Sequence, residues 1–298
     1  MNPSTANRFL ADFGRVIALG AALAVMFTLN LVFSSTTLIG HALLFLGSLY
    51  SLLFTKIALA DGDIRGGYVQ TGEGALGLLV IVIMVSFFSV PRAVVAAVCV
   101  VFVVLMEFYM HMVGHAPGRG RVAGGLFINL CAAAAGWYAV GRTGTGRAAV
   151  EDVLSGFSRS GGYAAWESIP FLAAGILLYV FLLKALPELK LFSHGKSYFE
   201  ITGIRYGRAR IAFVAARGVA VSGLVLFAGC LAGVGFLAGT MKEKNPLADE
   251  LKNLCAVNIF LQAMVLVGAL AGIAAAAAAA VALSYLLLFL YRRTHSNG

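Results

Sequence analysis

Long apolar stretches, separated by short polar segments, are the main pattern along this chain. About 20 apolar residues are enough to cross the hydrocarbon layer of a bilayer as a helix, and a soluble domain has no use for runs of this length. The pattern therefore predicts an all-α, polytopic transmembrane helical bundle with about eight spans. The expected spans are residues 14–34, 37–60, 75–90, 93–114, 122–141, 168–187, 211–240 and 254–291.

The last of these windows is the hardest to interpret. It is long for one tilted helix and short for two helices joined by a turn, and no proline interrupts it. We expect one long helix over 254–291, with an additional half-span as the alternative. The whole chain, 1–298, is interpreted as a single integral membrane domain.

Composition agrees with a membrane protein and changes the meaning of the net charge. Hydrophobic residues make up 60% of the chain and charged residues 12%, against about 25% charged residues in an ordinary soluble domain. The mean hydropathy is +0.91, which leaves no room for a large water-soluble domain. The formal net charge of +9 comes from basic residues in short loops beside apolar segments. This placement favours retention on one membrane side over nucleic-acid binding.

The placement of lysine and arginine predicts the orientation of the spans, because positively charged loops resist translocation. With the N-terminus on the inner side, most of the 22 lysines and arginines fall on that side, including Lys56 and Arg217. The smaller outer set includes Lys242, Lys244 and Lys252. Both termini are therefore expected in the cytoplasm. Short loops and the lack of a targeting segment indicate a bacterial inner (cytoplasmic) membrane.

Two loops are long enough to hold structure. The outer loop 142–167 contains apolar residues at helical spacing with charged residues on the other side, which predicts a short amphipathic helix on the membrane surface. The basic inner loop 188–210 is a candidate platform for protein partners or anionic lipid headgroups. Anchoring of the topology alone is the alternative for this loop.

Small residues spaced four apart predict where helices pack closely within lipid. The seventh span carries two such glycine pairs and the eighth carries a stripe of small residues, so we expect these spans to pack against each other or against another subunit. The candidate packing residues are Gly229, Gly233, Gly235, Gly239, Gly268 and Gly272.

Ionisable residues within spans are expensive and are functional candidates. Glu107, His111 and His115 follow one another at i+4 and share one helical face. On the expected topology this face descends toward the inner side, where the second span ends with four charged residues, Lys56, Asp61, Asp63 and Arg65. The favoured interpretation is a structural ion pair between Glu107 and Lys56. Proton relay and divalent metal binding by the same residues are the two alternatives.

Other polar residues within the apolar segments include Asn258, Gln262 and Arg217. Asn258 and Gln262 form an i+4 pair, for which we expect a hydrogen bond between helices, with an outer vestibule as the alternative. Arg217 lies a turn or two inside the seventh span. Its long side chain is expected to extend to inner headgroups.

Three short segments resemble parts of iron-siderophore and cobalamin ABC-importer permeases. They are TGIRYGRARIAFVAARGV at 202–219, VPRAVVAAVC at 90–99 and KNPLAD at 244–249. These segments cover under a fifth of the chain, they follow one another in a different order, and the chain has too few spans. No family is assigned from the resemblance, and no family residue is carried over.

The sequence therefore favours a non-enzymatic integral membrane subunit of a larger transport or secretion complex. Phosphate-binding loops and the common hydrolase and metalloprotease motifs are absent from it. The alternatives are a self-sufficient proton-coupled transporter or channel, and a membrane metalloprotein. Expected partners are membrane lipid and other proteins, and no cofactor is indicated.

Overall fold

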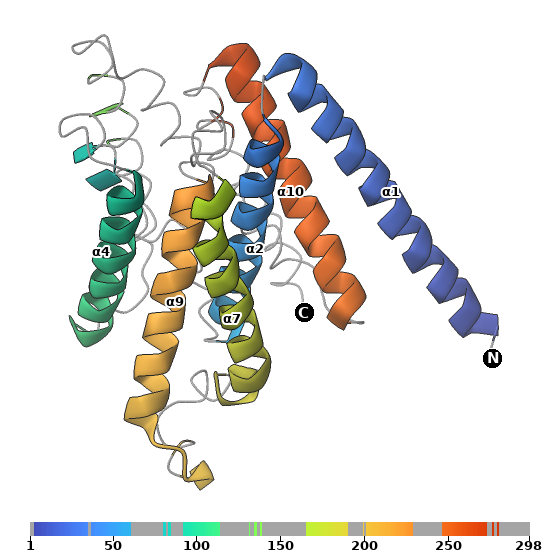
Figure 1. Cartoon of the computed structure of the whole chain (residues 1–298). Coiled ribbons are helices and arrows are strands. Elements are labelled where there is room, and N and C mark those ends of the chain that lie inside the picture. Colours follow the sequence, from blue (N-terminus) through green and yellow to red (C-terminus); the bar gives the residue numbers. More distant parts are fainter. Residues whose placement is uncertain are drawn as a thin grey trace.

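The computed structural model describes residues 3–34, 37–60, 92–113, 165–189, 201–228 and 246–272, together with 80–81, 83–84, 131, 134–135, 138, 199, 276 and 279. Over these residues the chain forms six α-helices and no β-strand (Figure 1). The all-α prediction is confirmed for this part of the chain. The helices are α1 (Pro3–Phe33), α2 (Leu38–Ala60), α4 (Arg92–Val113), α7 (Ala165–Leu189), α9 (Tyr206–Ala228) and α10 (Pro246–Ala271).

Five of these helices are long and apolar enough to cross a membrane, which supports a multi-pass integral membrane protein. In α4 the apolar part, Ala93–Tyr109, is shorter. The predicted windows 75–90 and 122–141 lie mostly outside the described residues, so the expected number of spans stays a prediction. The candidate spans are Gly14–Phe33, Leu38–Ile57, Ser168–Ala185, Tyr206–Phe227 and Glu250–Ala271.

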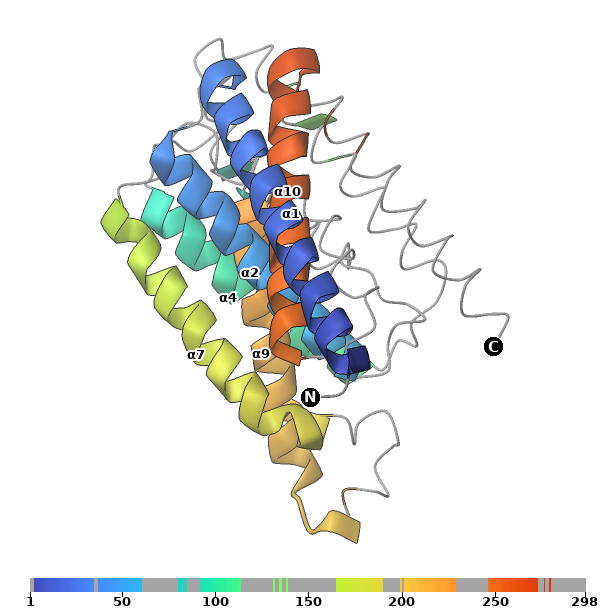
Figure 2. The same ribbon diagram turned by 90° about the vertical axis from the view of Figure 1, so that its right-hand side faces the viewer.

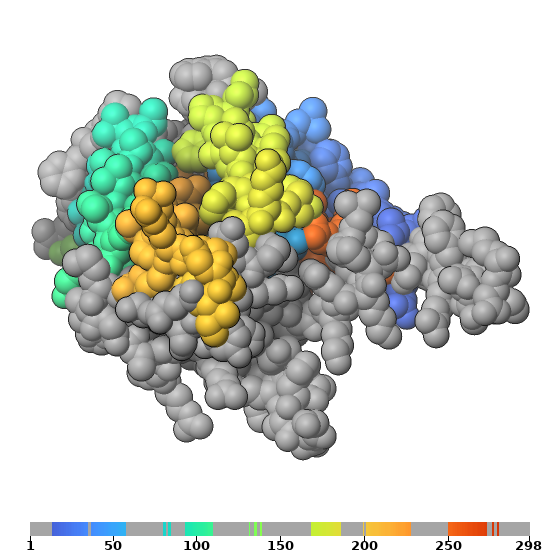
Figure 3. Space-filling model, turned by 90° about the horizontal axis from the view of Figure 1, so that it is seen from below, coloured from blue at the N-terminus to red at the C-terminus, as the bar shows by residue number. Residues whose placement is uncertain are grey.

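The helices stand side by side in a row, in the order α4, α9, α2, α10 and α1, and α7 lies against both α2 and α9. Figure 2 shows α1 and α10 running along each other at one end of this row. The view from below groups α4, α7 and α9 together, with α10 and α1 to one side (Figure 3). Because α2 and α9 have neighbours on several sides, most of their hydrophobic side chains are buried.

Tyr50 of α2 joins the centre of the bundle. A Cβ atom on Gly223 of α9 would lie 2.3 Å from Tyr50 Cδ1, so the ring occupies space that only glycine leaves open. The Tyr50 hydroxyl donates a hydrogen bond of 2.7 Å to the Phe171 carbonyl of α7, and its ring stacks at 6.0 Å on that of Phe227. One side chain therefore connects three helices, as close packing in lipid requires.

The observed close contacts involve glycines other than the predicted ones. A Cβ on Gly218 of α9 would lie 2.9 Å from Val104 Cγ2 of α4. Of the predicted glycines, Gly229, Gly233, Gly235 and Gly239 lie outside the described residues. Gly268 is buried in α10. Gly272 follows the end of α10 with φ of +91°, and a Cβ there would meet no atom within 4 Å.

This glycine also bears on the expected long helix over 254–291. A φ of +91° is incompatible with the α-helical backbone and is tolerated because glycine lacks a Cβ. The expectation of one unbroken helix is therefore wrong at Gly272. Hydropathy alone misses such a break, since glycine and alanine continue the apolar run.

The direction of α10 is a second correction. Glu250, near its start, contacts Lys56 near the end of α2, and Asn258 contacts Ser48, so α10 is antiparallel to α2. Gly223 of α9 lies against Tyr50 of α2 and Phe227 lies against Gly47, so α9 is antiparallel to α2 as well. Helices α9 and α10 consequently run in the same direction.

The eight-span pattern instead gave these two helices opposite directions and put the start of the last span on the outer side. In the structure the start of α10, with Lys252, lies on the same side as Lys56. The prediction that these two lysines face opposite sides is therefore wrong. Hydropathy measures the length of apolar segments and carries no information on the direction in which each one crosses.

Candidate functional site

A buried ion pair joins α4 to α9. Arg217 Nε lies 3.3 Å from Glu107 Oε2, and the two side chains are 6% and 0% exposed. The Arg217 guanidinium also lies 5.8 Å from the centroid of the Phe54 ring on α2. The close approach at Gly218, next in sequence to Arg217, brings the two backbones near enough for the side chains to meet. Each charge compensates the other in a region that water does not reach.

This pair corrects two expectations. Glu107 was expected to pair with Lys56, and Arg217 was expected to extend to headgroups. In the structure Arg217 is buried and is the partner of Glu107. The sequence signal was present, because an arginine and a glutamate each lie inside an apolar span. The sequence does not say which two helices are neighbours.

Lys56 belongs to a second polar cluster, at the end of α2. Its ammonium group forms an ion pair with Glu250 of α10. The Tyr179 hydroxyl of α7 donates a hydrogen bond of 2.6 Å to the other carboxylate oxygen of Glu250, and Lys56 Nζ lies 5.7 Å from the Tyr179 ring centroid. Glu250 therefore ties α10 to both α2 and α7. It was missed by sequence reasoning, which placed it in an outer loop.

A third polar group is a run of hydrogen bonds through α1, α10 and α2, which we call the polar chain. Asn30 Nδ2 donates to Gln262 Oε1 at 3.1 Å, Gln262 Nε2 donates to Asn258 Oδ1 at 3.1 Å, and Asn258 Nδ2 donates to Ser48 Oγ at 3.0 Å. All four side chains are at most 3% exposed. The expected hydrogen bonds between helices from Asn258 and Gln262 are confirmed.

The side chains of the remaining predicted ionisable residues lie outside the part of the chain that the structure describes. His111 lies in α4, but its side chain is outside the described part, as are His115, Asp61 and Asp63. Within the described residues, no group of three or more His, Cys, Asp or Glu side chains lies close enough to hold a metal ion. Proton relay and metal binding by these residues stay predictions.

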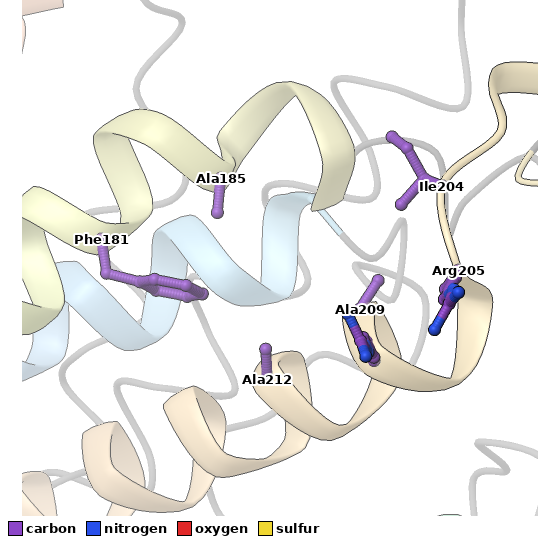
Figure 4. Close-up of a pocket in the computed structure, with 7 residues that line it drawn as sticks. Phe181, Ala185, Ile204, Arg205, Ala209 and Ala212 are labelled. Carbon is purple, nitrogen blue, oxygen red and sulfur yellow. The ribbon is translucent and has the colours of Figure 1, made fainter.

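A pocket of about 490 Å³ opens between the end of α7 and the start of α9. Figure 4 shows Ala185 of α7 facing Ala212 of α9, with Arg205 just before the start of α9. The turn before α9 contains Gly203 with φ of +71°. It lets the chain enter α9 so that Ile204 closes one end of the pocket. The lining residues are Phe181, Ala185, Ile204, Arg205, Arg208, Ala209 and Ala212.

The arrangement separates two kinds of polar group. The Glu107–Arg217 pair, the Lys56 cluster and the polar chain each have their partners within the bundle, which suits structural roles. In the pocket, the exposed side chains of Arg205 and Arg208 lie over an apolar lining, and none of the seven lining residues is acidic. The pocket therefore offers cationic groups to a ligand. Both arginines belong to the segment 188–210 that was expected to bind partners.

Comparisons with known proteins identify the fold. No family model matches the sequence, and no curated protein sequence matches it. A solved structure described as a metal-chelate type ABC transporter in an inward-facing conformation is similar to this chain, with a TM-score of 0.59 and 12% sequence identity. The similarity covers 94% of this chain and 98% of the solved chain. The chain therefore has the fold of an ABC transporter membrane subunit.

The similarity is one of fold alone, so the short resemblances at 202–219, 90–99 and 244–249 still assign no family. Sequence identity of 12% is too low to carry any residue of that protein to this one.

Proposed function

We propose that this chain is the membrane-spanning, non-enzymatic subunit of an ABC-type transport complex. The observation that carries the proposal is the similarity of the fold to an ABC transporter over nearly the whole of both chains. The absence of a phosphate-binding loop in the sequence supports it further, because hydrolysis of ATP then falls to a partner chain. Following the description of the similar structure, metal chelates are the first substrate class to test.

The partner surface in this proposal is the basic loop 188–210 on the inner side. It joins α7 to α9, and both helices contact α2 in the centre of the bundle. A partner that pulls on this loop would therefore act directly on the packed core. Packed interfaces tend to have discrete arrangements, so movement at one end of α9 can be transmitted along its length.

A self-sufficient proton-coupled transporter is the less supported alternative. It relied on Lys56 and Glu107 meeting near the inner leaflet, whereas these residues have separate partners, Glu250 and Arg217. A charged group already paired within the bundle is costly to recruit for proton transfer, because its partner would be left unpaired.

Purification of the tagged full chain from its native membranes in mild detergent tests the proposal. We expect stoichiometric companions that include a chain with ATP-binding motifs, and ATP hydrolysis by the recovered complex. A Lys190→Gln/Lys196→Gln variant in loop 188–210 should retain less of that partner. An Arg8→Gln/Arg15→Gln variant, with the same loss of charge on α1, should retain it fully. Recovery of a solitary chain that transports by itself in liposomes would contradict the proposal.

Substrate class needs a separate measurement. In the proposed complex, reconstituted vesicles should take up a chelated metal in an ATP-dependent manner and leave the free metal ion outside. Uptake of the free ion at the same rate would reject metal chelates as the substrate class and would leave the subunit assignment intact.

A further inference from the structure

We propose that the pocket between α7 and α9 binds one anionic phospholipid of the inner leaflet, with its phosphate at Arg205 and Arg208. The inference goes beyond the proposed transport function and does not depend on it. A volume of about 490 Å³ falls within the range of about 300–1,000 Å³ that ligand sites occupy. Three properties of the pocket identify the occupant, namely its charge, its apolar lining and its depth.

The charge of the pocket fits a phosphate group. Arg205 immediately precedes α9 and Arg208 lies in its first turn, and both line the pocket. Guanidinium groups form paired hydrogen bonds with phosphate oxygens, and the planar fork suits this geometry better than a lysine does. Since no lining residue is acidic, an anion binds there without competition from the pocket itself.

The rest of the lining fits an acyl chain. Phe181 and Ala185 of α7 and Ala212 of α9 supply an apolar wall, and the two alanines leave the space that a larger side chain would fill (Figure 4). Beyond the pocket, Leu177, one turn before Phe181 on the same face of α7, is 69% exposed, and Ile211, one turn after Arg208, is 59% exposed. Apolar exposed surface therefore continues from the pocket along both helices. This continuity favours a lipid, which is apolar beyond its headgroup, over a polar segment of a partner protein.

The depth of the pocket agrees with a headgroup. Arg217 lies beside Phe54 of α2. At a rise of 1.5 Å per residue, Arg205 lies about 18 Å from Arg217 along the axis of α9. The apolar span of α9 begins at Tyr206, so the two pocket arginines lie at its inner end. Basic residues at this level attract the anionic lipids of the cytoplasmic leaflet.

Native mass spectrometry of the purified full chain tests the inference. The probes are phosphatidylglycerol and phosphatidylcholine with identical acyl chains. We expect one phosphatidylglycerol molecule to be retained per chain with at least tenfold preference over phosphatidylcholine. Each arginine should contribute about fivefold to retention, so Arg205→Gln/Arg208→Gln should abolish the preference. Ala185→Phe, which fills the apolar part without changing charge, should also reduce retention.

Two controls keep the test specific. Arg8→Gln/Arg15→Gln removes the same charge from α1 and should leave the preference unchanged. Inorganic phosphate at millimolar concentration should not displace the lipid, because it lacks the acyl chain. Equal retention of both lipids, displacement by phosphate alone, or an equal loss in the α1 variant would overturn the inference. The inference would also be overturned if the Arg205→Gln/Arg208→Gln variant retained the lipid unchanged and lost a protein partner.

Discussion

The two sides of the bundle hold their buried polar groups in different ways. Between α4 and α9 the polar content is concentrated in one charged pair, Glu107 and Arg217, beside a close glycine contact. Between α1, α10 and α2 it is spread over the polar chain, whose members are neutral amides and a hydroxyl. The comparison teaches that a helical bundle in lipid can hold buried polar groups either by one strong ion pair or by several weaker hydrogen bonds.

The two solutions should fail differently. Removal of one member of a buried charged pair leaves the other charge in a region without water, and the cost is that of an uncompensated ion. Removal of one member of the polar chain leaves neutral groups, and hydrogen bonds between membrane helices average about 0.6 kcal/mol. The comparison therefore predicts an abrupt loss of stability on one side and a gradual loss on the other.

Glu107→Gln should have the largest effect, because Arg217 then stays charged and buried without its counter-charge. We expect a loss of about 3–5 kcal/mol in the free energy of unfolding, measured by denaturant unfolding in bicelles. The double variant Glu107→Leu/Arg217→Met removes both charges and should regain most of that stability. A single variant as stable as the natural chain would show that the pair is not coupled.

Gly223→Val should have the next largest effect, because its side chain would occupy the space of the Tyr50 ring, 2.3 Å from the position of the new Cβ. Overpacking of this kind costs about 1–3 kcal/mol, occasionally more. The matched control is Gly20→Val on α1, where a Cβ meets no atom within 4 Å. Equal unfolding curves for the two variants would argue against close packing of α2 on α9.

Asn258→Leu interrupts the polar chain in the middle, since Asn258 donates to Ser48 and accepts from Gln262. We expect a loss of about 1–2 kcal/mol, at the upper end for hydrogen bonds between membrane helices. Thr28→Val is the control, because the Thr28 hydroxyl bonds only within its own helix. A loss as large as that of Glu107→Gln would erase the distinction between the two sides.

Tyr179→Phe should have the smallest effect. Glu250 loses one hydrogen bond but keeps Lys56, and the carboxylate is 12% exposed. A loss of about 0.5–1.5 kcal/mol is expected, the usual net value of one hydrogen bond. Lys56→Met in the same assay should cost more than Tyr179→Phe, and the reverse order would show that the hydroxyl holds Glu250 in place.

The helices themselves could be predicted well from the sequence, since apolar length determines where a span begins and ends. The expected window 37–60 is α2 at Leu38–Ala60, and 93–114 is α4 at Arg92–Val113. Partners could not be predicted, because the pairing of Glu107 with Arg217 depends on which helices are neighbours and on how each is rotated. The direction of α10 was missed for a related reason, as hydropathy is the same read from either end.

The pocket at the end of α7 was only partly foreseen. The basic character of 188–210 indicated an anion or a partner, and Arg205 and Arg208 are among its charges. The apolar wall from Phe181 and Ala185 could not be inferred, since it depends on how far α7 extends beside α9. Sequence patterns identify which groups are available, and packing decides which of them share a space.

The bond between Asn30 and Gln262 also affects how the chain is made, because 232 residues separate its two ends. At about 5–20 residues per second, a ribosome needs on the order of 10–50 seconds to synthesise that distance. Until α10 has been made, Asn30 of α1 lacks the Gln262 amide that accepts its hydrogen bond. We therefore expect α1 to dock in the bundle only after α10 has been synthesised.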